Sequence, residues 1–231
     1  MLILLSKKNI ILFLFLLFVF GGASTVFHHN FSSAVSKVVT NTIILDAGHG
    51  GEDGGAIGIS GSKEKDINLA VTLKLKQKLL DSGFNVIMTR ESDIMLCDEK
   101  QQKKKKLTDL KNRVAISTKN NEAIFLSIHM NHYEDITQKG AQVFYSVNNS
   151  MSEEIAKNIQ NELKETVDQN NRREIKPSGK EIYILDKIKT PACLIECGFI
   201  SNPTEEQLLL NEDYQNKIAD AITNGIIKSK S

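Results

Sequence analysis

The chain has 231 residues, which suits one sizeable α/β domain or one domain with a short appendage. Apolar and charged fractions of 41% and 25% are ordinary for a soluble globular protein, and the net charge of +1 gives no reason to expect nucleic acid as a partner. The three cysteines do not make a disulfide scaffold. On one strand the Cα atoms of Cys193 and Cys197 would lie about 13 Å apart, too far for a bridge. Together with Cys97, they are expected to be free thiols.

The N-terminus carries the pattern of an exported protein. Lys7 and Lys8 precede eleven unbroken apolar residues at 10–20, a positively charged n-region followed by an apolar h-region. Small residues at 21–23 suit a signal peptidase. The stretch 10–27 would span about 27 Å as a helix, barely enough to cross a membrane. A cleaved signal peptide and a retained anchor therefore both stay open.

The chain is predicted to divide into three parts. Residues 1–27 form the signal peptide or membrane anchor, the polar residues 28–40 form a linker, and residues 41–231 form the folded domain. Export places this domain outside the cytoplasm.

Within the folded domain, short apolar runs alternate with amphipathic helix patterns. Strands are predicted at 42–45, 85–89, 123–128, 141–147, 182–185 and 192–195. Helices are predicted from 66 to a terminating Gly83, at 107–118, at 150–167, from 203 onward, and at 213–227. This spacing predicts an α/β fold. We expect a single, three-layer-like domain with a mostly parallel central sheet of about six strands, flanked by helices and joined by right-handed crossovers.

Two of the helices have specific signals at their starts. Ser150 and Glu153 form the S-x-x-E pattern of a capping box, which would open the helix at 150–167. Asn202 is a good N-cap residue, and the proline that follows it suits the first helical position. The charged stretch 92–106, which ends in a lysine run, is expected to be solvated.

Three polar residues follow or end apolar strands of the predicted sheet. His49 lies on a glycine-rich turn after the first strand, His129 ends the third, and Glu196 ends the strand at 192–195. Ligands of open α/β sheets collect beyond the carboxyl ends of the strands, so these side chains are expected to converge. Two histidines and a carboxylate are the ingredients of a catalytic zinc site. The pattern alone leaves open which carboxylate is a ligand and which is a base.

Each of these residues also has an ordinary structural interpretation. A lone His49 is most often a polar turn residue, and His129 can be a core histidine with satisfied hydrogen bonds. Glu196 can form a buried ion pair, with Arg113 or Arg90 as its partner. Convergence of the three residues on one sheet edge favours the functional interpretation.

Four sequence motifs carry a family resemblance. They are the stretch 46–51 (DAGHGG), Glu64 before a helix, the stretch 127–131 (SIHMN) and the stretch 194–202 (LIECGFISN). In this order they resemble the signatures of the zinc-dependent N-acetylmuramoyl-L-alanine amidases of the amidase-3 type. The similarity runs from about residue 42 to 227 and makes 41–231 an amidase-3 catalytic domain. Such a domain behind a short membrane segment resembles the germination-specific amidases that act on the spore cortex.

The resemblance implies a metal site and a reaction. His49, Glu64 and His129 would bind Zn²⁺, and Glu196 would be the catalytic carboxylate. The enzyme would hydrolyse the amide between the lactyl group of muramic acid and L-alanine in peptidoglycan. In the cortex this is the first step toward muramic lactam, which germination requires. Without the family, Glu64 would be interpreted as a solvated acid. The family motif has no counterpart of His132, which is therefore left out of the ligand set.

Location and partners are less directly indicated. The sequence ends directly after the last predicted helix and shows no wall-binding module, so substrate grip and location are expected to come from the membrane segment or from a protein partner. The resemblance implies work between the membranes of the forespore, at the cortex. Two other functions are compatible with the motifs: a zinc hydrolase for another peptidoglycan peptide bond, and a catalytically weak wall-binding or scaffold protein. The presence of all four candidate site residues argues against the scaffold.

Overall fold

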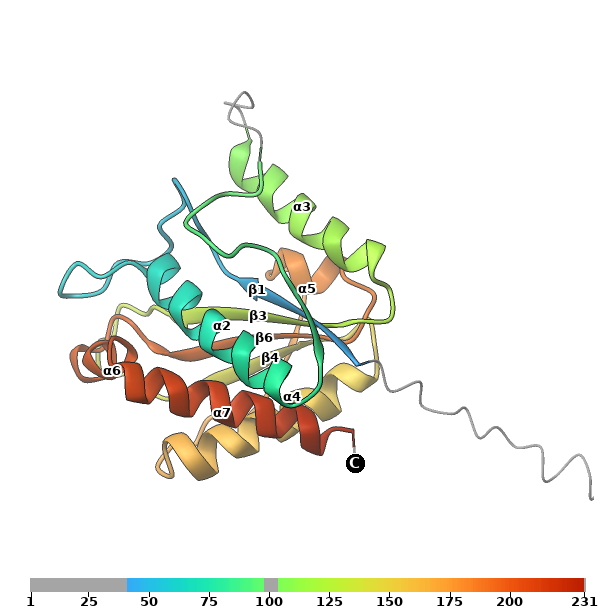
Figure 1. The fold of residues 1–231 in the computed structure, drawn as a ribbon. Coiled ribbons are helices and arrows are strands. Elements are labelled where there is room, and N and C mark those ends of the chain that lie inside the picture. Colours follow the sequence, from blue (N-terminus) through green and yellow to red (C-terminus); the bar gives the residue numbers. More distant parts are fainter. Residues whose placement is uncertain (1–40, 98–103, 231) are drawn as a thin grey trace, which may run out of the picture. The chain divides into compact units, whose positions relative to one another are not determined.

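Six strands form one sheet in the order β2-β1-β3-β6-β4-β5 (Figure 1). The strands are β1 (Thr42–Ala47), β2 (Asn85–Met88), β3 (Ile124–Asn131), β4 (Gln142–Ser146), β5 (Lys176–Ser178) and β6 (Ala192–Phe199). Neighbouring strands are parallel throughout, except that β4 runs antiparallel to β6. The predicted α/β fold with a mostly parallel sheet of about six strands is confirmed.

The structure is a computed structural model that describes residues 41–97 and 104–230. The predicted signal peptide or anchor at 1–27, the linker at 28–40 and part of the charged stretch 92–106 lie outside the described residues. Within the described ranges, no helix is long and apolar enough to cross a membrane.

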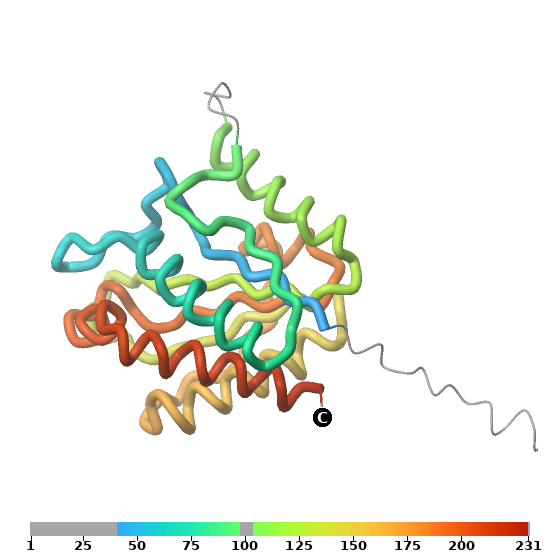
Figure 2. Tube along the Cα trace, in the orientation of Figure 1, coloured from blue at the N-terminus to red at the C-terminus, as the bar shows by residue number. Residues whose placement is uncertain are grey.

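Helices cover both faces of the sheet, in two groups. On one face lie α2 (Glu64–Asp81), α4 (Met151–Glu162) and α7 (Glu212–Lys228), with α7 running between the other two (Figure 2). The opposite face carries α3 (Lys105–Lys119) and α5 (Tyr183–Lys187) (Figure 1). A π-helical turn at Leu163–Val167 continues α4, and the short helix α6 (Pro203–Leu209) follows β6.

Alternation along the strands explains why two cores form. In β1, Ile43 and Leu45 belong to the core under α2, α4 and α7, whereas Ile44 belongs to the core under α3 and α5. Successive strand residues point to opposite faces, so each buried strand supplies both cores. By the same alternation, His129 lies on the same side of β3 as Phe125, and Glu196 lies on the same side of β6 as Leu194. Phe125 and Leu194 both belong to the core under α3 and α5, so His129 and Glu196 lie on the α3 side of the sheet.

Two local predictions are wrong. The stretch 182–185 is not a strand: α5 occupies 183–187, and the sheet edge beside β4 is taken by β5 instead. Ile184 and Leu185 are buried over the α3-side face, and the Asn148 side chain donates to carbonyls at the helix C-terminus. Short apolar runs fit either a strand or a helix, and tertiary packing decides between them.

The capping box at Ser150 does not form either. The side chain of Ser150 makes no cap hydrogen bond; instead Asn149 accepts from the backbone N–H of Met151 through its Oδ1 and from that of Ser152 through its carbonyl. At α6 the prediction is confirmed, because the Asn202 side chain accepts from two backbone N–H groups of the first turn.

Candidate metal centre

His49 lies on a tight turn directly after β1, in an unusual backbone conformation. Its φ is +62°, in the left-handed region that few residues other than glycine adopt. The turn aims the imidazole back over the sheet edge. There Nδ1 lies 2.9 Å from Oδ2 of Asp53, which leaves Nε2 free to face the other site residues. Burial lowers the pKa of His49, but the hydrogen bond and charge of Glu64, followed by those of Asp53, outweigh it and raise the pKa.

Glu64 is the first residue of α2, and its side chain turns back from the helix toward the sheet. Oε2 accepts a hydrogen bond from the backbone N–H of Ala56 at 2.8 Å, and Oε1 accepts from that of Met130 at 3.2 Å. The side chain is 5% exposed. Burial raises the pKa of Glu64, but hydrogen bonds with His129 and His49 outweigh it and hold the pKa far below its usual range. The residue is therefore an ionised, fixed acceptor.

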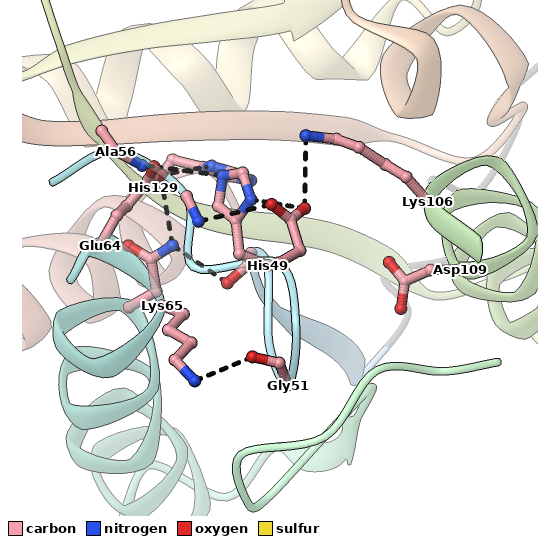
Figure 3. A network of polar contacts seen from close by, with 12 residues as sticks. His49, Gly51, Ala56, Glu64, Lys65, Lys106, Asp109 and His129 are labelled. Carbon is pink, nitrogen blue, oxygen red and sulfur yellow. Dashed lines mark hydrogen bonds and ion pairs between the residues drawn. The ribbon is translucent and has the colours of Figure 1, made fainter. Parts of the chain in front are cut away.

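His129 completes a compact group from inside β3. Its Nδ1 lies 2.9 Å from Glu64 Oε1, and Nε2 of His49 lies 3.2 Å from Glu64 Oε2. Figure 3 shows both imidazoles turned toward this carboxylate. The two rings meet edge to face, with centroids 5.0 Å apart and planes at 75°. The ring of His129 rests on Gly48, where an added Cβ would lie 2.2 Å from Nε2. Only glycine leaves room for the ring at this position.

These three residues suit a divalent metal ion. One ligand atom from each lies within 4.8 Å of the others, which is the spacing that a single ion can bridge. Neutral imidazole nitrogens and a carboxylate oxygen match the His₂Glu set that zinc takes in catalytic sites, with one position kept for water. In the described part of the chain, no other group of histidine, cysteine or acidic residues meets this criterion. His132, left out of the predicted ligand set, is exposed and lies outside the group.

Glu196 lies beside this group on the neighbouring strand. In the parallel pairing of β3 with β6 it is directly opposite His129, so both side chains leave the same face of the sheet. Its Oε2 is buried and has no hydrogen-bond partner. Burial, followed by the charge of Glu64, raises the pKa of Glu196 to about 7, against the opposing effect of the two histidines.

Neither Arg113 nor Arg90 forms the ion pair with Glu196 that its structural interpretation requires. Arg113 pairs with Asp46 and Asp109, and Arg90 donates to backbone carbonyls. Glu196 is half-buried as a residue, but its Oε2 is buried and lacks a partner, which is costly for a carboxylate; groups of this kind concentrate at functional sites. The arrangement therefore offers a metal site with a proton acceptor beside it.

Several residues that support the site had no motif to mark them in the sequence. Asp53 holds the Nδ1 side of His49, and Asn68 donates to the carbonyl of Gly48 and to Glu64. Arg90 and Arg113 donate to the carbonyls of the His49 turn. An acid four residues after a candidate ligand histidine could have marked Asp53, because ligating histidines commonly donate their second N–H to a carboxylate.

Comparison with known proteins gives a consistent result. The sequence profile of a family described as N-acetylmuramoyl-L-alanine amidase matches residues 43–228. The germination-specific N-acetylmuramoyl-L-alanine amidase of Bacillus subtilis (strain 168) is 39% identical over 188 residues, which cover 80% of this chain and 78% of that protein.

Solved structures agree with the sequence comparison. The CwlD amidase from Clostridioides difficile, solved in complex with the GerS lipoprotein, superposes with a TM-score of 0.79 at 48% identity, over 82% of this chain and 98% of that one. The amidase AmiC2 of Nostoc punctiforme superposes with a TM-score of 0.69 at 28% identity, over 81% and 95% of the two chains.

Proposed function

The chain belongs to the amidase-3 family of N-acetylmuramoyl-L-alanine amidases, and from this premise we propose that it is a zinc enzyme of the spore cortex. Its reaction is hydrolysis of the amide between the muramic acid lactyl group and L-alanine. One observation carries the proposal: the ligand atoms of His49, Glu64 and His129 lie within 4.8 Å of one another, with the unpartnered Glu196 carboxylate on the adjacent strand.

His49, Glu64 and His129 would hold the metal ion. In such a site Zn²⁺ supplies Lewis acidity, which activates water and polarises a carbonyl oxygen. His49 would bind through Nε2, because Asp53 occupies Nδ1, whereas His129 would bind through Nδ1, the nitrogen that faces Glu64. The backbone N–H groups of Ala56 and Met130 keep the Glu64 carboxylate in place.

Glu196 would act as the general base and then as the general acid. It takes a proton from the attacking water and delivers it to the nitrogen of the departing L-alanine. In the metal-free protein burial raises the pKa of Glu196 to about 7, so the environment of this carboxyl lets it hold and release a proton near neutral pH, as both steps require. The unpartnered oxygen is available for the proton because no other group of the described chain donates to it.

The proposals that the enzyme acts on the cortex and has a protein partner depend on two relatives of this chain. One relative is named a germination-specific amidase, and the CwlD structure contains the GerS lipoprotein. We extend both features to this chain: cortex peptidoglycan as the substrate, and a lipoprotein as an activating or localising partner. Residues 1–27 would export the enzyme or anchor it, and residues 41–231 would be the catalytic domain. With cortex as the substrate, the enzyme would work between the forespore membranes.

Two measurements test the proposal. Elemental analysis of the purified protein is expected to find one zinc ion per chain, and its removal by a chelator should abolish amide hydrolysis until zinc is restored. Spores that lack the protein are expected to lose muramic lactam from the cortex. A protein without metal that still binds wall glycan would be a scaffold. Cleavage at another peptide bond would make it a different peptidoglycan hydrolase.

A further inference from the structure

Two buried arginines lie beneath the turn that carries His49, and the proposed reaction does not use them. Arg90 follows β2, and Arg113 projects from the middle of α3; their residues are 2% and 1% exposed. Burying a guanidinium is unfavourable unless its donors are matched by acceptors, so the burial of both side chains requires a structural explanation. Their hydrogen bonds supply one.

Arg113 uses every N–H of its guanidinium. Nε and Nη2 donate to the carboxylate of Asp109, and Nη1 donates to Asp46 Oδ1 at 2.5 Å. The remaining donors reach the turn: Nη1 lies 2.8 Å from the carbonyl oxygen of Ala47, and Nη2 lies 2.7 Å from that of His49. Asp46 and Asp109 balance the charge of Arg113 and fix the plane of its guanidinium. The guanidinium in turn holds the carbonyl of His49, which is itself a candidate metal ligand.

Arg90 donates to the same turn from the segment that follows β2. Its Nε donates to the carbonyl of Ala47 at 2.8 Å and its Nη2 to that of Gly48 at 2.9 Å. A further bond from Nη2 ties the carbonyl of Lys65, one residue after the ligand Glu64, to the same guanidinium at 2.8 Å. One side chain therefore joins the His49 turn to the start of α2, the two segments that carry His49 and Glu64.

Together the two arginines donate hydrogen bonds to three consecutive carbonyls, those of Ala47, Gly48 and His49, which point into the protein. A chain that turns its carbonyls inward at Ala47, Gly48 and His49 leaves buried acceptors, which destabilise the fold if they stay unpaired. The same turn holds His49 at φ +62°, a conformation that is strained for a residue other than glycine. Such a turn persists only where surrounding groups determine it; here those groups are the two arginine forks, together with the Asn68 side chain, which also donates to the Gly48 carbonyl.

We propose that Arg113 and Arg90 are positioning residues, which hold the left-handed turn at His49 so that its imidazole meets Glu64 and His129 in metal-binding geometry. The inference rests on the metal site of the proposed function. Lysine cannot replace either side chain, because an ammonium offers three donors at one point, whereas the arginine fork spreads five over a plane. Arg113→Lys therefore keeps the charge beside Asp46 but cannot also reach the His49 carbonyl.

The test compares zinc affinity in Arg113→Lys, Arg90→Lys and a matched control, Arg173→Lys. Arg173 also donates to a backbone carbonyl, that of Lys139, and stacks on Phe199, but it does not contact the His49 turn. Zinc Kd is measured by competition with a chelator, at a temperature where thermal unfolding shows every metal-free variant to be folded. We expect Kd to rise about 10- to 100-fold in the first two variants and to stay unchanged in the control.

A second readout follows the turn directly in the metal-free protein. The ¹³Cα and ¹³Cβ chemical shifts of His49 report its backbone conformation, and they should leave the left-handed range in Arg113→Lys and Arg90→Lys only. Unchanged shifts and unchanged Kd in a folded variant would overturn the inference. If Arg113→Lys does not fold, the zinc Kd and the His49 chemical shifts of Arg90→Lys test the inference instead. A wild-type protein that binds no zinc would contradict the metal site, while the His49 shifts would still decide the role of the arginines.

Discussion

In the metal-free protein, the stability of Glu196→Gln relative to wild type is expected to increase as the pH rises. The unpartnered carboxylate has its pKa raised from 4.5 to about 7 in the folded state, mainly by burial. Folding then favours the protonated form, so ionising the group opposes folding. Below pH 4.5 both states hold the proton and nothing is lost. Between pH 4.5 and 7 stability falls as the unfolded state alone gives up the proton, and above pH 7 the loss is complete.

The magnitude follows from the two pKa values. A rise from 4.5 to about 7 corresponds to roughly 3 kcal/mol at pH 8, and to less than about 1 kcal/mol at pH 5. Glutamine keeps the shape of the side chain and cannot ionise. Its buried amide has a cost of its own, but that cost is the same at every pH. The difference between variant and wild type should therefore shift by about 2 kcal/mol in favour of the variant from pH 5 to pH 8.

The assay is denaturant unfolding of both proteins in the presence of a chelator, at pH 5, 6, 7 and 8. A chelator is needed because a bound cation would favour the ionised carboxylate. Glu134→Gln, which removes an exposed acid from the loop after β3, is the matched control and should show no pH-dependent difference. A difference between Glu196→Gln and wild type that is the same at pH 5 and pH 8 would refute the reasoning that burial strains this carboxylate.

Further predictions concern the metal group and its neighbours. Glu196→Ala should retain zinc by elemental analysis yet lose about 10²- to 10⁴-fold in the rate of amide hydrolysis; full activity would dismiss it as the base. His49→Ala and His129→Ala should each lose the metal during purification, and a full zinc content in either would remove that residue from the ligand set. Gly48→Ala should displace the His129 ring, because the new Cβ would lie 2.2 Å from Nε2; zinc affinity and activity should fall together, and an unchanged Kd would contradict this. Asp53→Ala should weaken zinc binding by about 10- to 100-fold, read by chelator competition, since the acceptor that orients the His49 ring is lost.

The architecture could be predicted from the sequence because its signals are local. Apolar runs such as 42–45 and 123–128 are buried on both faces of a parallel sheet, and the helices between them carry one apolar side. The strand predicted at 182–185 is wrong because this apolar run is too short for its periodicity to distinguish a strand from a helix. The sheet edge beside β4 is instead occupied by β5. The capping box predicted at Ser150 does not form because Asn149, one residue earlier, accepts from the backbone N–H groups of Met151 and Ser152 at the start of the helix.

The site was only partly predictable, because some of its residues are marked by local sequence and others by contacts that exist only in the folded chain. His49, His129 and Glu196 follow or end apolar runs, so strand topology alone brings them to one edge. Glu64 depended on the family, because nothing in its local sequence shows that its side chain turns back to meet Met130 and Ala56. Arg113 is separated from His49 by 64 residues, and a contact over that distance becomes visible only in the folded chain.

Mass spectrometry of purified peptidoglycan digested with the zinc-loaded protein shows directly which bond the protein cleaves. We expect soluble stem peptides with a free N-terminal L-alanine, together with glycan strands whose muramic acid keeps an unsubstituted lactyl group. Neither product should appear with Glu196→Ala. Peptides that begin at any other residue, or glycan that leaves the digest with its stem peptides intact, would contradict the assignment of this chain as an amidase for the lactyl–alanine bond.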